Sequence, residues 1–540
     1  MLRRQVILIS IFKKNGLWLT MILLCLVGSG CFKQGQATRE PDLVHVKSLK
    51  GRESKKVILI VADSLMPQAI KDGLTNKKLP AFQYLIEHGQ YYSNMVSSFP
   101  TMSVTIDSSL LTGAYPDDHR IPGLTWYSTK DQELINYGTG PLEVATLGID
   151  PVLTNAVIHL NGRHLNPQLP TIYEDLARLG RRAGSINGLI YRGTESHTLS
   201  PPAWMHAPTS LPKSVTVKGP DFLALGALSD PLKGIVNLPD GLTRRMGMNN
   251  DFSIETANYL IRNNKLPDFL YVYLPDLDKK IHKQGPSPKL KGVQELDRQL
   301  QTLLDSFGSP EQALQKAVII VLGDSGMTRI LPQREDSVIE LRSLFRGYNV
   351  LQPGDKVTDE TEAVLAVNET MAYVYNLKSD ELKPFADILK TDPRIGFISW
   401  KERDWIHVMQ GGGTTMLRFR KNGSLIDPYR QKWSVEQDKI LLDLKIDAAR
   451  RQLNYGRYPD VLRRLYGALH SHPGNFLVVT AKPGYELADI NSPTHPGGGG
   501  HGAFGQAESL VPLIISGTEK RPPYLRMVDL KDYLINLVTQ

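Results

Sequence analysis

The sequence predicts an α/β fold with a mostly parallel central sheet that is covered by helices on both faces. Continuous apolar runs rich in β-branched residues recur along the chain, and segments with helical periodicity lie between them. Strands that are buried on both faces have this unbroken apolar pattern, and parallel strands need long, usually helical, connections. The runs that predict strands are 57–61, 269–273, 318–322, 476–479 and 511–515.

The chain is long enough for a large core and an insertion. It has 540 residues, of which 41% are hydrophobic and 22% charged, as in ordinary globular proteins. We find no internal repeat. The pattern becomes polar and alternating after about residue 335, which indicates an inserted α+β cap subdomain. We therefore expect a signal segment at 1–30, a tether at 31–55, a catalytic core at 56–335 and 471–540, and the insertion at 336–470.

The first thirty residues have the pattern of an export signal. Four basic residues and no acidic one accompany an apolar stretch at 17–27, which is short for a membrane span and typical of a signal peptide. Small residues then precede Cys31, an ending that resembles the lipobox of bacterial lipoproteins, although Gly28 stands where that family usually has a Leu-like residue. We expect an exported protein that Cys31 anchors to the membrane surface through a lipid, with an uncleaved membrane anchor as the alternative.

The charge distribution argues against a nucleic-acid-binding surface, and the cysteine content excludes thiol metal ligands and disulfides in the mature body. Half of the formal net charge of +8 comes from the basic residues of the signal, and the remainder forms no basic block, so we expect no nucleic acid as a structural partner. The only cysteines are Cys25 and Cys31, which leaves the mature body without a thiol or a disulfide. A metal site must therefore consist of His, Asp, Glu and hydroxyl groups.

Carboxylates follow three of the predicted strands. Asp63 and Asp324 each end an apolar run, and Asp278 comes shortly after a third. Ligands bind at the carboxyl ends of strands in open α/β sheets, so these groups would meet in one crevice. His282 lies one helical turn after Asp278, on the same face of a helix, and His501 follows the glycine-rich segment HPGGGGHG. An isolated Asp after a strand is usually a turn former or helix cap, but this combination favours a metal site.

The segment SSFPTMSVTIDSSLLTG at 97–113 adds a hydroxyl. A helical pattern runs from about Val104 to Gly113, which is a natural helix stop. Thr101 therefore falls at a helix N-terminus, where free N–H groups attract phosphate. An ordinary Thr N-cap has the same appearance, but a nearby metal would make this hydroxyl a nucleophile.

These motifs together resemble the alkaline phosphatase superfamily, specifically its type I phosphodiesterase/nucleotide pyrophosphatase branch. The resemblance covers most of 56–340 and 476–517. It depends on VILIVADSL, FPTMSVTIDSSLLTGAYPDDH, DKKIHKQGP, GDSGM and the late HG, in that order.

The resemblance implies a two-metal phosphoric ester hydrolase. Thr101 would attack phosphorus in line, and water would then release the phosphothreonine. The implied ligands of one metal are Asp278, His282 and His501, and those of the second are Asp63, Thr101 and Asp324.

Two departures from the family pattern bear on the second metal and on the substrate. Ser325 stands where the family has a histidine ligand, and Ile106 stands where the nucleotide pyrophosphatases have a substrate-binding Asn. We expect Zn²⁺, with Mn²⁺ as an alternative, at Asp278/His282/His501. We expect a weaker, exchangeable Zn²⁺, Mn²⁺ or Mg²⁺ at the other site, with Ser325 as a weak ligand, because oxygen-only sites suit hard cations.

The favoured function is an exported, metal-dependent hydrolase of phosphodiesters or phosphomonoesters. The alternative is a degenerate surface lipoprotein that binds phosphate-bearing ligands without turnover. A sulfatase is excluded because its modifiable Cys or Ser with Pro and Arg neighbours is missing. We interpret the remaining isolated histidines as structural, pocket-rim or surface residues: His119, His159, His164 and His407.

Overall fold

The computed structural model describes residues 55–139, 141–202, 212–286 and 291–540, which all belong to one compact unit. The signal and tether, including Cys31, lie outside the described residues. Within the described ranges, none of the helices combines the length and apolar character needed to cross a bilayer.

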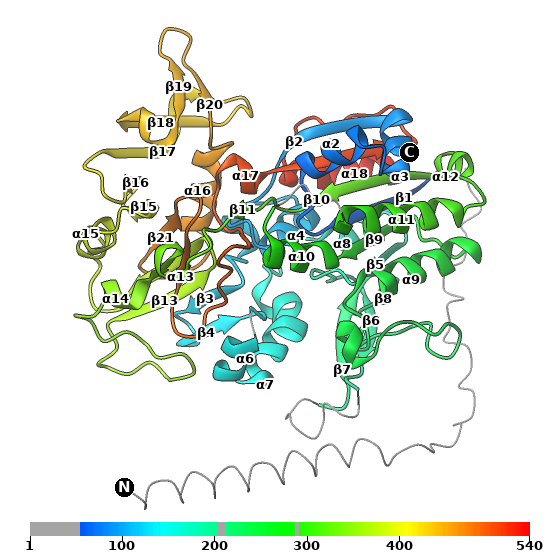
Figure 1. Cartoon of the computed structure of the whole chain (residues 1–540), viewed down its shortest axis with the longest axis horizontal. Helices are drawn as coiled ribbons and strands as arrows, with labels where there is room; N and C mark the ends of the chain where they lie inside the picture. The colour runs from blue at the N-terminus through cyan, green and yellow to red at the C-terminus, as the bar shows by residue number, and fades with distance from the viewer. Residues whose placement is uncertain (1–54, 140, 203–211, 287–290) are drawn as a thin grey trace, which may run out of the picture. The chain divides into compact units, whose positions relative to one another are not determined.

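A seven-stranded sheet forms the core, and the prediction of a mostly parallel sheet is confirmed (Figure 1). The central strand β1 pairs in parallel with β10 on one side and with β9 on the other, whereas β24 is antiparallel to both of its neighbours. In spatial order the strands are β2 (Gly89–Val96), β24 (Leu510–Ser516), β10 (Ala317–Gly323), β1 (Lys56–Ala62), β9 (Phe269–Leu274), β5 (Ala183–Ile186) and β8 (Phe222–Ala224).

Helices cover both faces of this sheet because successive residues of a strand point to opposite faces. Val57, Leu59 and Val61 of β1 belong to one buried cluster, and Ile58 and Ile60 belong to another. On the first face lie α4 (Ser103–Thr112), α8 (Ile172–Arg178) and α18 (Leu530–Val538). On the second face lie α2 (Pro67–Thr75), α3 (Pro80–Glu87), α9 (Asn250–Arg262) and α11 (Lys291–Asp305).

A nine-stranded sheet makes up most of the insertion and is built mainly from antiparallel pairs. It includes Phe476–Ala481 (β21), which pairs with β14 and β15, so the prediction that the core resumes at Phe476 is wrong. An unbroken apolar run shows that both faces of a strand are covered but not which sheet it joins. The other strands are β13 (Ala363–Asn368), β14 (Met371–Asn376), β15 (Ile395–Glu402), β16 (Trp405–Gln410), β17 (Met416–Ile426), β18 (Lys432–Gln437), β19 (Leu444–Asp447) and β20 (Gln452–Tyr455).

Smaller elements lie between the strands of these two sheets in the chain. Two hairpins, β3–β4 and β6–β7, and three short helices, α5 to α7, lie between β2 and β8 in the chain. Their bounds are α5 (Pro116–His119), β3 (Thr125–Ser128), β4 (Glu133–Asn136), α6 (Pro141–Leu147), α7 (Ile149–Thr154), the π-helical η2 (Asn155–His164), β6 (Glu195–Leu199) and β7 (Val215–Gly219). Further along are α10 (Asp276–Gln284), α12 (Pro310–Lys316), α15 (Lys383–Lys390), α16 (Val461–Leu469) and α17 (Gln506–Ser509).

Candidate active site

The three predicted carboxylates lie at the carboxyl ends of three adjacent strands. Asp63 directly follows β1, Asp324 directly follows β10, and Asp278 lies in the first turn of α10, which begins just after β9. Because β10, β1 and β9 are neighbours and run parallel, their ends meet at one edge of the sheet. The fold therefore brings these carboxylates together.

Ser64 connects all three carboxylates. Its backbone N–H donates to Asp324 Oδ1 (2.8 Å), and its hydroxyl lies 2.9 Å from Asp278 Oδ1 and 3.4 Å from Asp63 Oδ1. The residue has φ +58°, a conformation that non-glycine residues rarely adopt. No sequence pattern singled out this serine.

Two imidazoles face Asp278. His282 Nε2 lies 3.1 Å from Asp278 Oδ1, and His501 Nε2 lies 3.7 Å from the same oxygen. The other ring nitrogen of each histidine faces a backbone carbonyl: His282 Nδ1 that of Gly499 (2.8 Å), and His501 Nδ1 that of Thr101 (2.5 Å). A carbonyl only accepts, so Nδ1 is the donor toward the backbone in both rings and Nε2 is the nitrogen left to bind a metal, as in metal-binding histidines.

The carboxylates repel one another in the absence of a cation. Burial and the charges of Asp278 and Asp324 raise the pKa of Asp63 well above its ordinary value, and burial also raises the pKa of Asp324. Burial opposes the charge of Asp278 too, but His282 outweighs it and lowers the pKa of Asp278 to about 2. Against the effect of burial, Glu369 and Asp278 raise the pKa of His282 to about 10. Without a metal, the charge of protonated His282 thus offsets part of the negative charge of Asp278 and Glu369.

This donor set fits divalent cations. Within the described ranges, no Lys or Arg side chain forms an ion pair with Asp63, Asp278 or Asp324. The ligand atoms of Asp278, His282 and His501 lie within 4.8 Å of one another. This nitrogen-rich group suits Zn²⁺, and the oxygen donors of Asp63 and Asp324 suit a harder cation.

Near the start of α4, the hydroxyl that contacts a carboxylate of this cluster belongs to Ser103, whereas that of Thr101 contacts the backbone. Thr101 Oγ1 accepts from Gly502 N (2.7 Å) and donates to Ala503 O (3.1 Å), and the residue is fully buried. Helix α4 begins at Ser103, whose Oγ donates to Asp324 Oδ2 (3.0 Å). In this geometry the Thr101 hydroxyl bonds to two backbone groups, and its expected role as ligand and nucleophile stays a prediction.

Ser325 lies inside the cluster, but among the described residues its hydroxyl contacts another hydroxyl and no carboxylate. Its N–H donates to the Asp324 side chain (Oδ1, 2.6 Å), and its Oγ lies 3.4 Å from Ser64 Oγ. Asp324 Oδ1 is therefore held by two backbone N–H groups, and Oδ2 is left for Ser103. Tyr273 donates to Asp63 Oδ2.

Sequence reasoning missed two further groups beside the histidines. Glu369, at the tip of the β13–β14 hairpin, lies 3.6 Å from His282 Nε2, and the His495 ring lies 4.2 Å from the His282 ring. The segment around Glu369 looks like an ordinary polar turn between two apolar runs, so it gave no signal. Ser103, by contrast, had a recognisable sequence signal. It is the hydroxyl residue directly before Val104, where the apolar periodicity begins.

The isolated histidines have structural contacts. His119 is fully buried and bonds to Ser109 Oγ (3.0 Å), and burial lowers its pKa to about 3. His164 bonds to Tyr137 OH (2.8 Å), His159 to Asn155 Oδ1 (3.0 Å), and His407 stacks on Trp400. None of the four belongs to a group of metal donors among the described residues.

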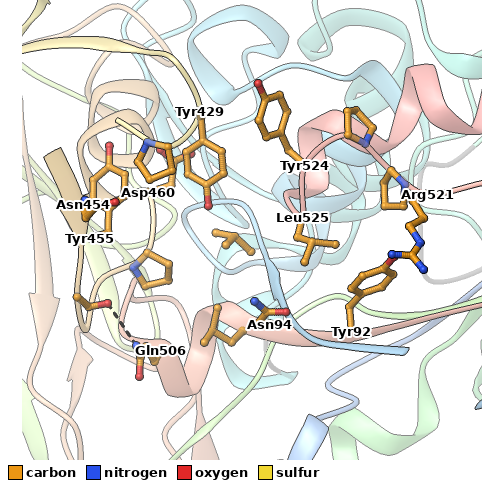
Figure 2. Close-up of a pocket in the computed structure, with 17 residues that line it drawn as sticks. Tyr92, Asn94, Tyr429, Asn454, Tyr455, Asp460, Gln506, Arg521, Tyr524 and Leu525 are labelled. Carbon is orange, nitrogen blue, oxygen red and sulfur yellow. Dashed lines mark hydrogen bonds between the residues drawn. The ribbon is translucent and has the colours of Figure 1, made fainter. Parts of the chain in front are cut away.

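The structure also has a pocket of about 630 Å³, and none of the predicted metal donors lines it. Figure 2 shows the tyrosine side chains around it, together with Gln506, which donates to Gly456 O (3.2 Å). Tyr429 packs edge-on against Tyr524, and the Arg526 guanidinium lies 4.0 Å from the Tyr429 ring. Size alone does not make it the reaction site, because the clustered carboxylates and imidazoles lie elsewhere.

The sequence matches the family model described as type I phosphodiesterase/nucleotide pyrophosphatase over residues 57–502. Among solved structures, the fold is similar to that of murine ectonucleotide pyrophosphatase/phosphodiesterase 5, with a TM-score of 0.53, 14% identity, and coverage of 90% of this chain and 95% of that one. An inactive variant of the murine protein in complex with AMP gives a TM-score of 0.52 at the same identity and coverage. No curated protein sequence gives a significant match.

Proposed function

Because the chain belongs to the type I phosphodiesterase/nucleotide pyrophosphatase family, we propose that it hydrolyses phosphoric esters with Ser103 as the nucleophile. One observation carries this proposal: the hydrogen bond of 3.0 Å from Ser103 Oγ to Asp324 Oδ2. It supports the proposal because it joins a hydroxyl to the carboxylate cluster. Ser103 is also only partly buried, so a substrate could reach it.

The N-terminus of α4 would bind the phosphoryl group. This helix has ten residues, and no side chain caps its first N–H groups. Such groups, together with the helix dipole, favour a phosphate. Ser103 is the first residue of the helix, so its hydroxyl would lie beside the bound phosphorus.

Two groups of side chains would hold divalent cations: Asp278, His282 and His501 on one side, and Asp63, Asp324 and Ser103 on the other. When bound, the cations would neutralise phosphoryl charge during the displacement. Asp324 Oδ2 accepts the hydrogen bond from Ser103, so it is suited to receive the hydroxyl proton. The Ser103 oxygen would form a bond to phosphorus while the bond from phosphorus to the ester oxygen breaks. The leaving oxygen would take the proton held by Asp324 and depart as an alcohol, and water would then cleave the phosphoserine to serine and phosphate.

We also propose that the protein acts outside the cytoplasm. The basic start, the apolar stretch at 17–27 and Cys31 after small residues support export and lipid anchoring. The proposed metal ligands include no cysteine thiol, so an oxidising environment outside the cytoplasm would not impair them.

The test is turnover of an aryl phosphate diester and an aryl phosphate monoester by the full chain, with divalent metals added singly. We expect turnover that chelation abolishes and that Ser103→Ala lowers by at least about 10³-fold. Thr101→Val is the matched control: it removes a structural hydroxyl and should keep the rate within about tenfold while costing about 1–3 kcal/mol of stability.

Two outcomes would contradict the proposal. Ser103→Ala hydrolysing at the wild-type rate would exclude this nucleophile. A wild-type chain that binds a phosphate ester but turns none over with any metal would favour the alternative of a non-catalytic binding protein.

A further inference from the structure

We propose that Glu369 of the inserted sheet is a fourth protein ligand of the metal ion held by Asp278, His282 and His501. The inference rests on the proposed metal centre and deepens it. In the resemblance to the family, all ligands come from the core motifs, whereas Glu369 lies between β13 and β14 of the other sheet.

The first argument is geometric. Four donors follow one another around a ring: Asp278 Oδ1 to His282 Nε2 (3.1 Å), His282 Nε2 to Glu369 Oε1 (3.6 Å), Glu369 Oε2 to His501 Nε2 (4.0 Å), and His501 Nε2 back to Asp278 Oδ1 (3.7 Å). Ligand atoms 2.0–2.2 Å from a tetrahedral zinc are about 3.3–3.6 Å apart. These four edges are close to the required spacing, but within 4.8 Å Glu369 groups with His282 and His495 rather than with Asp278 and His501. Binding of one ion would therefore draw the Glu369 carboxylate further toward Asp278.

The second argument is the direction of the lone pairs. His282 and His501 both donate through Nδ1 to backbone carbonyls, so both Nε2 atoms face the space between Asp278 and Glu369, where a metal would replace any Nε2 proton. Two carboxylates and two neutral imidazoles balance the charge of one divalent ion. Without Glu369 the same ion would keep a net positive charge beside a buried carboxylate that has no Lys or Arg partner among the described residues.

The third argument is that the surrounding structure fixes Glu369. It is the first residue of a two-residue hairpin loop and has φ +58°, where glycine would be the unstrained choice. Its Oε2 also accepts from His501 N (3.1 Å). The next residue, Thr370, donates from its backbone to His501 O (3.1 Å) and from its hydroxyl to Glu508 Oε2 (3.0 Å).

The hairpin tip and the His501 loop approach too closely for any larger residue at Gly502. A Cβ there would lie 2.5 Å from the carbonyl oxygen of Asn368, and Gly502 has φ +133°. On the other side, His495 packs against the His282 ring and lies 3.3 Å from the Glu486 carboxylate. These contacts hold the glutamate and the histidine at the distances that a metal site requires.

A fourth protein ligand changes the expected behaviour of this ion. Structural zinc sites have four protein ligands, whereas catalytic sites keep a position open. With Glu369 bound, the ion would be held tightly and would join the core sheet to the inserted sheet. Metal binding should then raise the melting temperature, because a ligand that binds only the folded state stabilises it.

The experiment is a titration of the full, metal-free chain with Zn²⁺ alone against a chromophoric chelator, together with thermal melting. Glu369→Gln keeps the hydrogen bond to His501 N but removes the charged ligand. We expect it to weaken Zn²⁺ binding at least tenfold and to reduce the Zn²⁺-induced rise in melting temperature. Glu402→Gln is the matched control, because Glu402 also faces a histidine of the same sheet, His407, at 3.6 Å. It should bind Zn²⁺ like the wild type.

A Glu369→Gln chain that binds Zn²⁺ within twofold of the wild type, with the same rise in melting temperature, would overturn the inference. If this variant does not fold, Glu369→Asp serves instead, since it keeps the charge but withdraws the oxygen, and the same tenfold loss is expected. Failure here is distinct from failure of the proposed function. Zinc affinity does not depend on turnover, and Ser103→Ala tests turnover without removing Glu369.

Discussion

The two halves of the candidate active site differ in the donors that they present. Around Asp278, the Nε2 atoms of two imidazoles face carboxylate oxygens. Around Asp63 and Asp324, the neighbours are hydroxyls: Ser64, Ser103 and Tyr273. Nitrogen donors raise affinity for Zn²⁺, and oxygen donors favour exchangeable hard cations. Under the proposal that both halves bind divalent cations, the comparison predicts that the first half keeps its metal and the second exchanges it.

The largest expected effect separates the two halves by mutation. His501→Ala should lower Zn²⁺ affinity by more than about 100-fold, because it removes a nitrogen ligand. Asp324→Asn should leave the tight Zn²⁺ within about threefold and still lower turnover strongly, because it alters the partner of Ser103. Metal content after dialysis, measured beside turnover, gives both values. Equal loss of tightly bound metal in the two variants would break the distinction between the halves.

A second experiment gives the oxygen-rich half, around Asp63 and Asp324, a nitrogen donor like those around Asp278. Ser325→His adds a nitrogen donor beside Asp324, and we expect Zn²⁺ affinity at this half to rise about tenfold or more. The hydrolysis rate should change with it. Equilibrium dialysis that counts bound Zn²⁺ per chain measures the effect, and circular dichroism checks that the buried substitution still folds. Unchanged metal content and rate in a folded variant would show that Ser325 does not determine the donor set.

A third prediction concerns Asp107, which lies behind Ser103 in α4. Burial raises its pKa to about 7, and the hydrogen bond from Tyr271 only partly offsets this effect. A raised pKa means that the folded state holds the proton more tightly than the unfolded state. Its stabilising contribution is therefore full below pH 4 and is lost as the pH rises to 7. At about 1.4 kcal/mol per pH unit, the loss is on the order of 2–4 kcal/mol.

Asp107→Asn should remove this pH dependence. Denaturant unfolding of both proteins should give a wild-type minus variant difference that falls between pH 4 and pH 8, with the variant relatively more stable at the alkaline end. A difference that stays constant over this range would mean that Asp107 is ionised in the folded protein at neutral pH.

The smallest expected effect is that of Ser64→Gly. Glycine relieves the strain of φ +58° but removes the hydroxyl that contacts Asp278 Oδ1. Each effect is about 1 kcal/mol and they have opposite signs, so the free energy of unfolding should change by less than about 1 kcal/mol. Chemical denaturation measures it. A loss of several kcal/mol would mean that the Ser64 hydroxyl holds the carboxylates together.

The sequence was sufficient to predict the groups whose position depends on strand ends. Asp63, Asp278 and Asp324 each follow an apolar run, and the parallel sheet brings such ends together whatever the loops do. His282 could be predicted to face Asp278 because it lies one helical turn later, on the same face of α10. The strand at Phe476 was assigned to the wrong sheet because an apolar run does not identify its partner strands.

The rest of the site depends on distant contacts that one sequence does not encode locally. Glu369 reaches His282 only because a hairpin of the inserted sheet packs against the His501 loop. Sequence analysis placed Thr101 at a helix N-terminus, whereas α4 begins at Ser103, because periodicity locates a helix end only to within one or two residues. The backbone contacts of Gly502 and Ala503 with Thr101 also join segments that are distant in the sequence.

The most direct test of the account is to locate the covalent phosphate. The full chain would be mixed with an aryl phosphate ester, quenched in acid during turnover, and digested for peptide mass spectrometry. We predict a phosphoryl group on Ser103 that is absent in Ser103→Ala and still present in Thr101→Val. A phosphoryl group on Thr101, or turnover by Ser103→Ala at the wild-type rate, would contradict the account.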